Sequence, residues 1–196
     1  MLLLRLAAIL PPSLPQGGFE LLWKVTRTNQ QGFGHAVAAV PDLDGDGFVD
    51  LLCGEPEAAD LAARGGAIEI LSSRNHARLL RIASPAPDDY LGSAISSLDD
   101  VDGDGWCDVA AGAPGAGANY GAVCAFSSRT GALLWSASGA AFEFGHALAL
   151  MSDLDGDGIR DLAASYRSDA SRIDLLSGLD GSLIRFLSAP SSGTFR

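Results

Sequence analysis

The chain has 196 residues, which is enough for one domain with a substantial hydrophobic core. Its 24 acidic residues outnumber its 13 lysines and arginines, for a net charge of −11, and no basic patch suggests nucleic acid or an acidic membrane surface as a partner. The three cysteines are too few for a disulfide framework.

The first ten residues, MLLLRLAAIL, resemble the hydrophobic region of a signal peptide and precede the segment PPSLPQGG. We therefore expect residues 1–18 to form a leader, and the mature protein to lie outside the cytoplasm. No run of about 18 apolar residues predicts a membrane span. The next segment, FELLWKV (Phe19–Val25), is typical of the last strand of a β-sheet unit.

Three segments then repeat the same text in the same order. Each begins with a glycine among small and apolar residues (GFGHAVAAVP, YLGSAISSLD and FEFGHALALM). Each continues through an aspartate-rich loop and a short apolar run (LLCGEP, VAAGAP and LAASYR), and ends in two further runs of strand length. We predict propeller repeats over residues 19–196, the three complete ones spanning about 33–84, 91–138 and 144–188.

The apolar runs predict strands and not helices. They are four to seven residues long and are bounded by Gly, Pro, Asp and Ser; in the third run Ile68 and Ile70 point to one face and Glu69 to the other. Four such strands in every ~50–58 residues predict an all-β fold of four-stranded antiparallel β-propeller blades. The Gly/Ala/Ser-rich first run suits the innermost strand. Trp23 and Trp135 recur in the last strand and are predicted to pack between blades.

The aspartate loops predict metal sites. In DLDGDGFVD the carboxylates fall at positions 1, 3, 5 and 9, with glycines at 4 and 6 that allow a left-handed backbone. Alternate side chains of such a loop converge on one point, and the carbonyl at position 7 adds an oxygen. The candidate ligands are Asp42, Asp44, Asp46, Phe48 and Asp50; Asp100, Asp102, Asp104, Trp106 and Asp108; and Asp153, Asp155, Asp157, Ile159 and Asp161.

Calcium is the predicted ion, with up to three bound. Four clustered carboxylates suit its six or seven oxygen ligands better than they suit the smaller, octahedral magnesium. An EF-hand would need Glu at position 12, where this chain has Cys53, Ala111 and Ala164. Metal-free aspartate turns would not require a carboxylate at all four positions three times over.

The combination of Phe33–Gly34, the aspartate loop and GEP (Gly54–Pro56) or GAP (Gly112–Pro114) resembles the FG-GAP repeat, which builds the amino-terminal propeller of integrin alpha subunits and occurs in many secreted bacterial proteins. The resemblance implies calcium bound through positions 1, 3, 5, 7 and 9 of a loop between the first two strands. The second repeat departs from the pattern at Leu91–Gly92, and the third at Ala164–Tyr166.

No residue pattern indicates catalysis. His35 and His146 follow the FG pair and are predicted to be packing or capping residues, while Glu55 and Glu57 are predicted to be solvated loop acids. There is no nucleophile elbow and no phosphate-binding glycine loop. The cysteines are predicted to be buried thiols, a Cys107–Cys124 bridge being the alternative.

The four-strand pattern places the aspartate loops on one face of the propeller and the loops between second and third strands on the other. The latter differ in length between repeats, as expected of a surface that binds a ligand. We therefore expect a non-enzymatic, calcium-binding scaffold for adhesion or recognition outside the cell. The alternative is an accessory or docking domain of a secreted hydrolase. The sequence leaves open whether the ligand is a protein or a polysaccharide.

The number of repeats predicts a partial or open propeller. Closed propellers use 4–8 blades, whereas this chain has three complete repeats. We expect two bare blade faces, each lined with apolar residues, and further blades supplied by a longer chain or by self-association.

Overall fold

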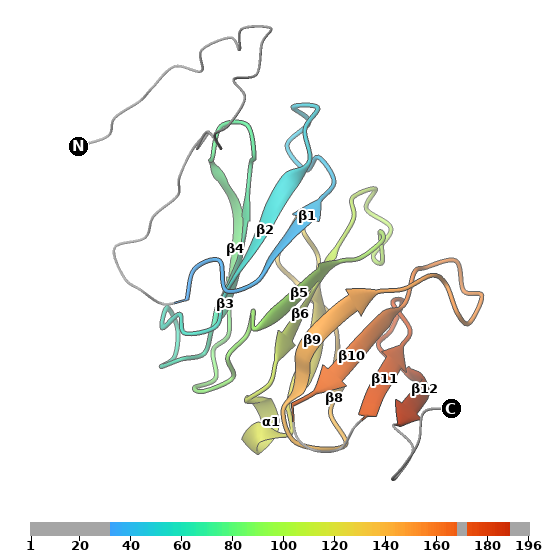
Figure 1. Cartoon of the computed structure of the whole chain (residues 1–196). Helices are drawn as coiled ribbons and strands as arrows, with labels where there is room; N and C mark the ends of the chain where they lie inside the picture. Colours follow the sequence, from blue (N-terminus) through green and yellow to red (C-terminus); the bar gives the residue numbers. More distant parts are fainter. Residues whose placement is uncertain (1–31, 168–171, 189–196) are drawn as a thin grey trace, which may run out of the picture.

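The computed structural model describes residues 32–167 and 172–188, so the predicted leader, the segment Phe19–Val25 and Trp23 lie outside the described residues. Within these ranges the chain forms three four-stranded sheets, one for each repeat (Figure 1). The prediction of an all-β fold built from four-stranded blades is therefore confirmed. In the described part of the chain, no helix has both the length and the apolar character needed to cross a membrane.

Each sheet is formed by consecutive strands in chain order, and we call the sheets blades 1, 2 and 3. Blade 1 contains β1 (Val37–Val40), β2 (Asp50–Glu55), β3 (Ala67–Leu71) and β4 (Arg78–Ala83). Blade 2 contains β5 (Ala94–Ser97), β6 (Val109–Ala113), β7 (Ala122–Phe126) and β8 (Leu133–Ser138), with the short turn α1 (Ala116–Asn119) between β6 and β7. Blade 3 contains β9 (Phe144–Leu150), β10 (Leu162–Tyr166), β11 (Arg172–Leu176) and β12 (Leu183–Ser188).

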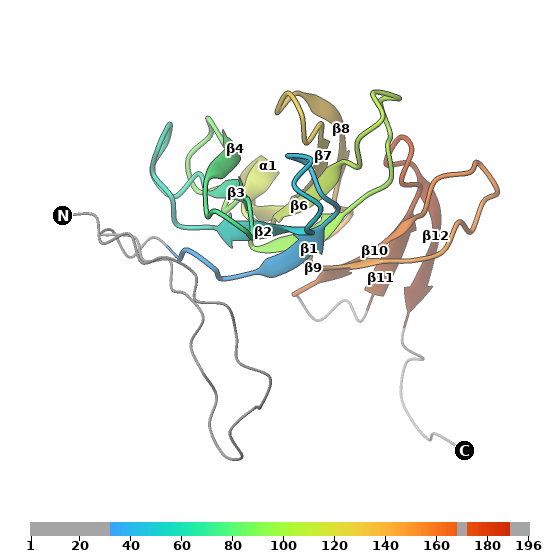
Figure 2. The ribbon, with the colours of Figure 1, turned by 90° about the horizontal axis from the view of Figure 1, so that it is seen from above.

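All neighbouring strands within a blade are antiparallel, and the three blades fan out side by side (Figure 2). The first strands β1, β5 and β9 contact one another from blade to blade. They therefore take the inner position that their small residues predicted. The described blades form an open arc and no closed ring.

The FG and GAP glycines lie together where one blade meets the next. A Cβ atom on Gly112 would lie 1.9 Å from the carbonyl oxygen of Gly145, and one on Gly54 would lie 2.1 Å from that of Gly92. Only glycine allows the entry segment of the next blade to cross the second strand this closely. Ser165 occupies the same position in blade 3, so a further blade could not approach there as closely as at the two junctions described.

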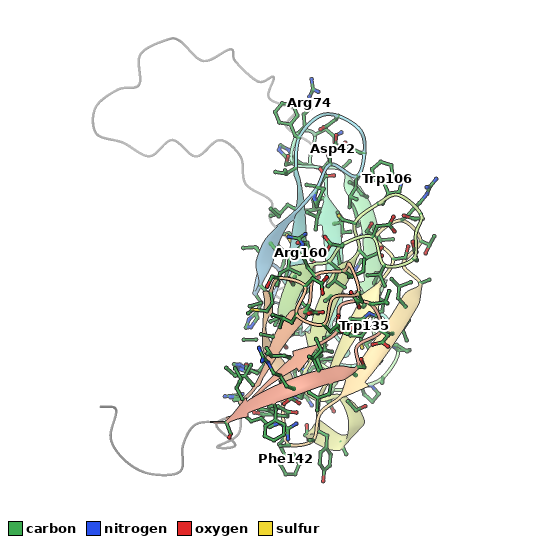
Figure 3. The ribbon with its side chains drawn as sticks, turned by 90° about the vertical axis from the view of Figure 1, so that its right-hand side faces the viewer. Asp42, Arg74, Trp106, Trp135, Phe142 and Arg160 are labelled. Carbon is green, nitrogen blue, oxygen red and sulfur yellow. The ribbon has the colours of Figure 1, made fainter. Side chains whose placement is uncertain are left out.

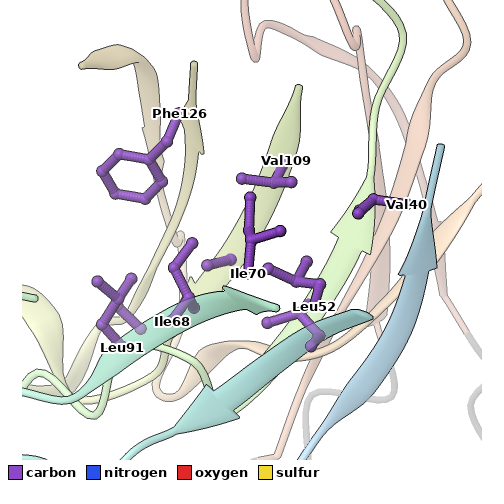
Figure 4. Close-up of a cluster of buried hydrophobic side chains, with 10 residues drawn as sticks. Val40, Leu52, Ile68, Ile70, Leu91, Val109 and Phe126 are labelled. Atoms are coloured by element: carbon purple, nitrogen blue, oxygen red, sulfur yellow. The ribbon is translucent and has the colours of Figure 1, made fainter. Parts of the chain in front are cut away.

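Two hydrophobic clusters fill the spaces between blades. The first joins blades 1 and 2 through Ile68, Ile70, Leu91, Val109 and Phe126, among others (Figure 4). The second joins blades 2 and 3 around Phe144, Trp135, Leu162 and Tyr166. The predicted alternation of β3 is confirmed, because Ile68 and Ile70 enter the first cluster, whereas Glu69 lies on the opposite face of the sheet, where it pairs with Arg78.

Trp135 packs between blades, as its position in the repeat predicted. Its side chain is 9% exposed and lies in the second cluster. The indole Nε1 donates a hydrogen bond of 3.0 Å to the carbonyl of Gly178 in blade 3. A Cβ atom on Gly181 would lie 2.5 Å from the indole ring, so this glycine, with φ 73°, allows the hairpin of blade 3 to lie against the ring.

The side of blade 1 that faces away from blade 2 carries a cluster of charged residues beside the exposed Val37, so the expectation that this outer face is lined with apolar residues is wrong for most of it. The Arg81 guanidinium pairs with Glu55 at 2.9 Å and with Asp60, and lies 3.6 Å from Glu69. Glu55 and Glu69 are buried, which also corrects the prediction that Glu55 is a solvated acid. Buried carboxylates need such partners because desolvation penalises an unpaired charge.

On blade 3 the outer face retains apolar residues. Ile173 occupies the position in β11 that Ile68 has in β3 and Val123 has in β7. Ile68 and Val123 are buried against the next blade, whereas Ile173 is 41% exposed. Leu187 is its cross-strand partner and is 50% exposed. The expected apolar lining is therefore present on this side.

We expect the hydrogen bond between Arg81 and Asp60 to make stability depend on pH in acid. The Arg81 Nε donates to Asp60 Oδ2 at 2.5 Å, and this bond lowers the pKa of Asp60 below its usual 3.8. A carboxyl with a lowered folded-state pKa stabilises the fold above its unfolded pKa, and this contribution is lost as pH falls through the folded value.

Replacing Asp60 with Asn should therefore lower the free energy of unfolding at neutral pH by about 0.5 kcal/mol, a small value because the side chain is 36% exposed and screened by water. The difference from wild type should disappear below the folded pKa. Urea unfolding at neutral and acidic pH measures both quantities. Glu57→Gln removes an exposed charge from the same loop and is the control; an equal loss in that variant would exclude the Arg81 bond as the cause.

Candidate metal loops

The three aspartate loops each connect the first and second strands of a blade, and strands flank all of them. In the first loop, Asp42 accepts hydrogen bonds from the backbone N–H groups of Gly45 and Gly47, both at 2.7 Å. These two glycines have φ values of 78° and 88°, in the left-handed region. The chain thus wraps around the first carboxylate, which is why glycines are needed at positions 4 and 6.

The last aspartate of each loop is buried and fastens the loop to its own blade. Asp50 accepts hydrogen bonds from the N–H groups of Leu43 within the loop and Ser73 in the hairpin between β3 and β4. Asp108 makes the same contacts with Val101 and Ser128. In blade 3 the corresponding contacts of Asp161 are with Leu154 and Gly178.

The carboxylates of positions 1, 3 and 9 converge in every loop. In each group one oxygen from each residue lies within 4.8 Å of the others, and the groups are Asp42, Asp44 and Asp50; Asp100, Asp102 and Asp108; and Asp153, Asp155 and Asp161. The three predicted clusters of carboxylates thus form in space. A cation could contact all three carboxylates of a group, because hard cations favour several oxygen ligands around one point.

Position 5 lies beside each group rather than within it. Asp46 Oδ1 accepts a hydrogen bond of 2.9 Å from the N–H of Phe48, and Asp104 does the same with Trp106. The second oxygen of Asp46 is buried and has no hydrogen-bond partner. A buried carboxylate oxygen without a donor is costly, and a cation in the loop would satisfy it. The donor set therefore fits a hard cation.

The pKa shifts in the loops reflect two opposing effects. Backbone N–H groups, Gly47 first, lower the pKa of Asp42 and keep it ionised. Burial raises the pKa of Asp108, and the charge of Asp102 raises it further. The pKa of Asp155 is also raised, by desolvation first and then by its aspartate neighbours. The loops thus gather negative charge that a bound cation would neutralise.

The side chain of Arg74, in the hairpin between β3 and β4, also contacts the loop, and no motif in the sequence indicated this contact. The Arg74 guanidinium donates to the carbonyl of Asp46 at 3.2 Å and lies over the ring of Phe48, 5.4 Å from its centre. Figure 3 shows Arg74, Asp42 and Trp106 at one end of the molecule and Phe142 at the other. The loops between first and second strands thus lie on the face predicted for them.

The histidines and cysteines lie apart from these loops. His35 and His146 are exposed and line a cavity, so of the two predicted roles, packing and capping, packing is wrong. None of the three cysteines forms a disulfide, as the preferred interpretation predicted; Cys53 is buried, whereas Cys107 and Cys124 are half-buried. Burial raises the pKa of the Cys107 thiol to about 11 and keeps it protonated.

Comparisons with known proteins agree with this geometry. A family model described as the FG-GAP repeat matches residues 33–68 and 91–124. Integrin alpha-4 of Xenopus laevis is 34% identical over 153 residues, covering 71% of this chain and 15% of that protein. Integrin alpha-PS3 of Drosophila melanogaster is 32% identical over 159 residues (72% and 14%), and integrin alpha-M of Mus musculus is 38% identical over 149 residues (67% and 13%). The chain therefore spans less than a sixth of the length of these relatives.

Proposed function

The chain is an FG-GAP repeat protein related to integrin alpha subunits, and from this we propose that it is a calcium-binding β-propeller scaffold that recognises a ligand outside the cell. The observation that carries the proposal is the threefold convergence of carboxylate oxygens within 4.8 Å. A cluster of this kind at one loop could be an acidic turn. Its recurrence at the same place in three blades supports a common ligand, and calcium suits oxygen-only sites best.

In this proposal the calcium ligands are the side chains of positions 1, 3, 5 and 9 and the carbonyl of position 7 in each loop. Bound calcium would neutralise the carboxylates and fix each loop against its blade. The buried position-9 aspartates already tie the loop to the hairpin between third and fourth strands. The ion would therefore stiffen one whole face of the arc, and its role is structural rather than catalytic.

The opposite face supports recognition. The connection from β2 to β3 is long, the one from β6 to β7 contains the turn α1, and both differ in sequence from their equivalents. Constant loops on one face and variable loops on the other suit a scaffold that presents a binding surface. We place this surface outside the cell, in adhesion or ligand capture, and assign it no catalytic activity. A further blade, from a longer chain or a second copy, would cover the exposed Ile173 and Leu187.

Substitution of the variable loops tests the recognition role. Replacing residues 57–65 or 115–120 with short Gly/Ser linkers should abolish capture of ligands on an array of glycans and matrix proteins. Because these loops lie opposite the aspartate loops, calcium affinity should stay unchanged. Replacement of residues 57–65 should lower the melting temperature, because it removes the bond between Asp60 and Arg81. The control replaces the exposed residues Arg129 and Thr130 of a hairpin on the calcium face. If the wild-type chain captures nothing, or if the loop variants capture as well as wild type, recognition by this face is wrong.

A further inference from the structure

A cavity of about 550 Å³ lies at the face opposite the aspartate loops and spans all three blades. Blade 1 contributes His35 and Glu57 to its wall, blade 2 contributes Tyr90, and blade 3 contributes Glu143 and Arg167. The cavity sits where the chain enters the inner strand of each blade, and its volume is in the range of small-molecule sites.

The residue just before the FG pair, or its equivalent, lines the cavity in all three blades. In two blades it is not glycine although its backbone is left-handed, a conformation that is unfavourable for other residues. Blade 1 has Gly32 at this position with φ 78°, as a left-handed backbone favours. Blades 2 and 3 have Tyr90 at φ 55° and Glu143 at φ 58° in the same conformation. All three residues line the cavity. Glycine would adopt this backbone conformation without strain in blades 2 and 3 as well. Non-glycine residues with a strained backbone concentrate at functional sites.

A third strained residue lies beside them. Asn119 has φ 72°, lines the cavity, and accepts a hydrogen bond of 2.8 Å from the N–H of Glu143 through its backbone carbonyl. Seven non-glycine residues in the described ranges have positive φ, and three of them line this one cavity. The adjacent Tyr120 is 48% exposed and stacks with Phe142, with ring centres 5.0 Å apart. These two aromatic residues are the sequence neighbours of the lining residues Asn119 and Glu143.

The lining groups combine hydrogen-bond acceptors and donors in near balance. Glu57 and Glu143 offer carboxylates, Arg167 offers a guanidinium 3.8 Å from Glu143, and His35 and His146 can each both donate and accept. An anion would meet two carboxylates, and a cation would meet the arginine. A neutral sugar instead presents hydroxyl groups that both donate and accept, together with C–H faces that pack on aromatic rings such as Tyr90.

We propose that this cavity is a binding site for a neutral saccharide, with Tyr90 as the stacking residue and Glu143 and Asn119 as hydrogen-bonding residues. The inference rests on the proposed recognition function and names its ligand class. It also explains why blades 2 and 3 have Tyr90 and Glu143 where blade 1 has Gly32: the two side chains would contact the sugar.

The test measures binding of a panel of neutral oligosaccharides (maltotriose, cellotriose, xylotriose, mannotriose and triacetylchitotriose) to the full chain in calcium by titration calorimetry. We expect at least one to bind, and Tyr90→Gly and Glu143→Gly each to weaken it at least about tenfold, as loss of a stacking or hydrogen-bonding partner does. Their melting temperatures should fall only slightly, because glycine suits the left-handed backbone there, although each variant loses one side-chain contact, with Arg64 or with Arg167. Glu143→Gln keeps the size of the side chain and provides a second variant should glycine impair folding.

His76→Gly is the matched control, because His76 is also left-handed (φ 64°), and the equivalent hairpin positions hold Gly131 and Gly181. It lies in the hairpin on the aspartate-loop face, so binding should be unchanged. If no oligosaccharide binds at millimolar concentration, or if all cavity variants bind like wild type, the saccharide site is wrong. If the chain then captures a protein through its variable loops, only the saccharide site is wrong and the recognition function stands. If it captures no ligand at all, both proposals are wrong.

Discussion

Removal of calcium is expected to lower the melting temperature of the chain by a large margin. A site at free calcium 100-fold above its dissociation constant adds about 2.7 kcal/mol to the free energy of unfolding, and three such loops converge in the structure. For a domain of this size each site corresponds to roughly 5–10 °C. The comparison is thermal unfolding in millimolar calcium, in millimolar magnesium and in chelator. We expect the melting temperature to be highest in calcium, and the melting temperature in magnesium to lie near that in chelator.

Single-loop variants separate the three contributions. Asp44→Ala and Asp102→Ala each remove one converging carboxylate. Each should remove one site's share of the calcium-dependent increase in melting temperature, while the melting temperature in chelator stays nearly unchanged. Asp180→Ala, which removes an aspartate from the hairpin between β11 and β12, is the control and should keep the full increase. Equal melting temperatures of wild type in calcium and chelator would refute the metal assignment.

Truncation of Trp135 to Ala is expected to be the most damaging single substitution in the core. The indole is buried between blades 2 and 3 and bonds the carbonyl of Gly178, so its removal leaves a cavity and an unsatisfied acceptor. Buried Trp→Ala changes cost about 3–5 kcal/mol. The effect should appear in urea unfolding, and hydrogen exchange should show blade 3 losing protection first, because this contact joins it to blade 2.

Two further variants separate packing from polar contact. Trp135→Phe keeps an aromatic ring but loses the hydrogen bond. We expect it to lower the free energy of unfolding by less than half as much as Trp135→Ala does. Leu133→Ala lies on the same strand at a side chain that is 57% exposed, so its effect should stay within about 0.5 kcal/mol. If Trp135→Ala unfolds no more easily than Leu133→Ala, the indole does not hold the two blades together.

The features that were predictable from sequence are those set by local spacing. The convergence of Asp42, Asp44 and Asp50 follows from alternation in a glycine-containing loop, and it needs no knowledge of the rest of the chain. The strands were predictable for the same reason, because Ile68 and Ile70 alternate with Glu69 within one run. Trp135 could be placed between blades because a repeat fixes the same role for the same position.

The features that were missed depend on contacts between distant segments. Glu55 looked like a loop acid because its partner Arg81 lies 26 positions away, on a strand that meets it only in the folded blade. The exposure of His35 and His146 is set by the arrangement of three blades around one cavity. The left-handed backbone of Tyr90 has no signature in its side chain; only alignment with Gly32 would have indicated it.

The strict chain order of the sheets has a consequence for how the protein is made. In the described ranges every strand pairs only with its neighbours in sequence, and the four strands of each blade follow one another along the chain. Loop closure therefore costs little entropy, and each blade can pair its strands by successive local hairpins. During synthesis, blade 1 can form its hydrogen bonds while blade 3 is still being translated. The glycine junctions, where Gly92 meets Gly54 and Gly145 meets Gly112, then let each new blade dock on a finished one, so folding can advance from one end of the arc to the other.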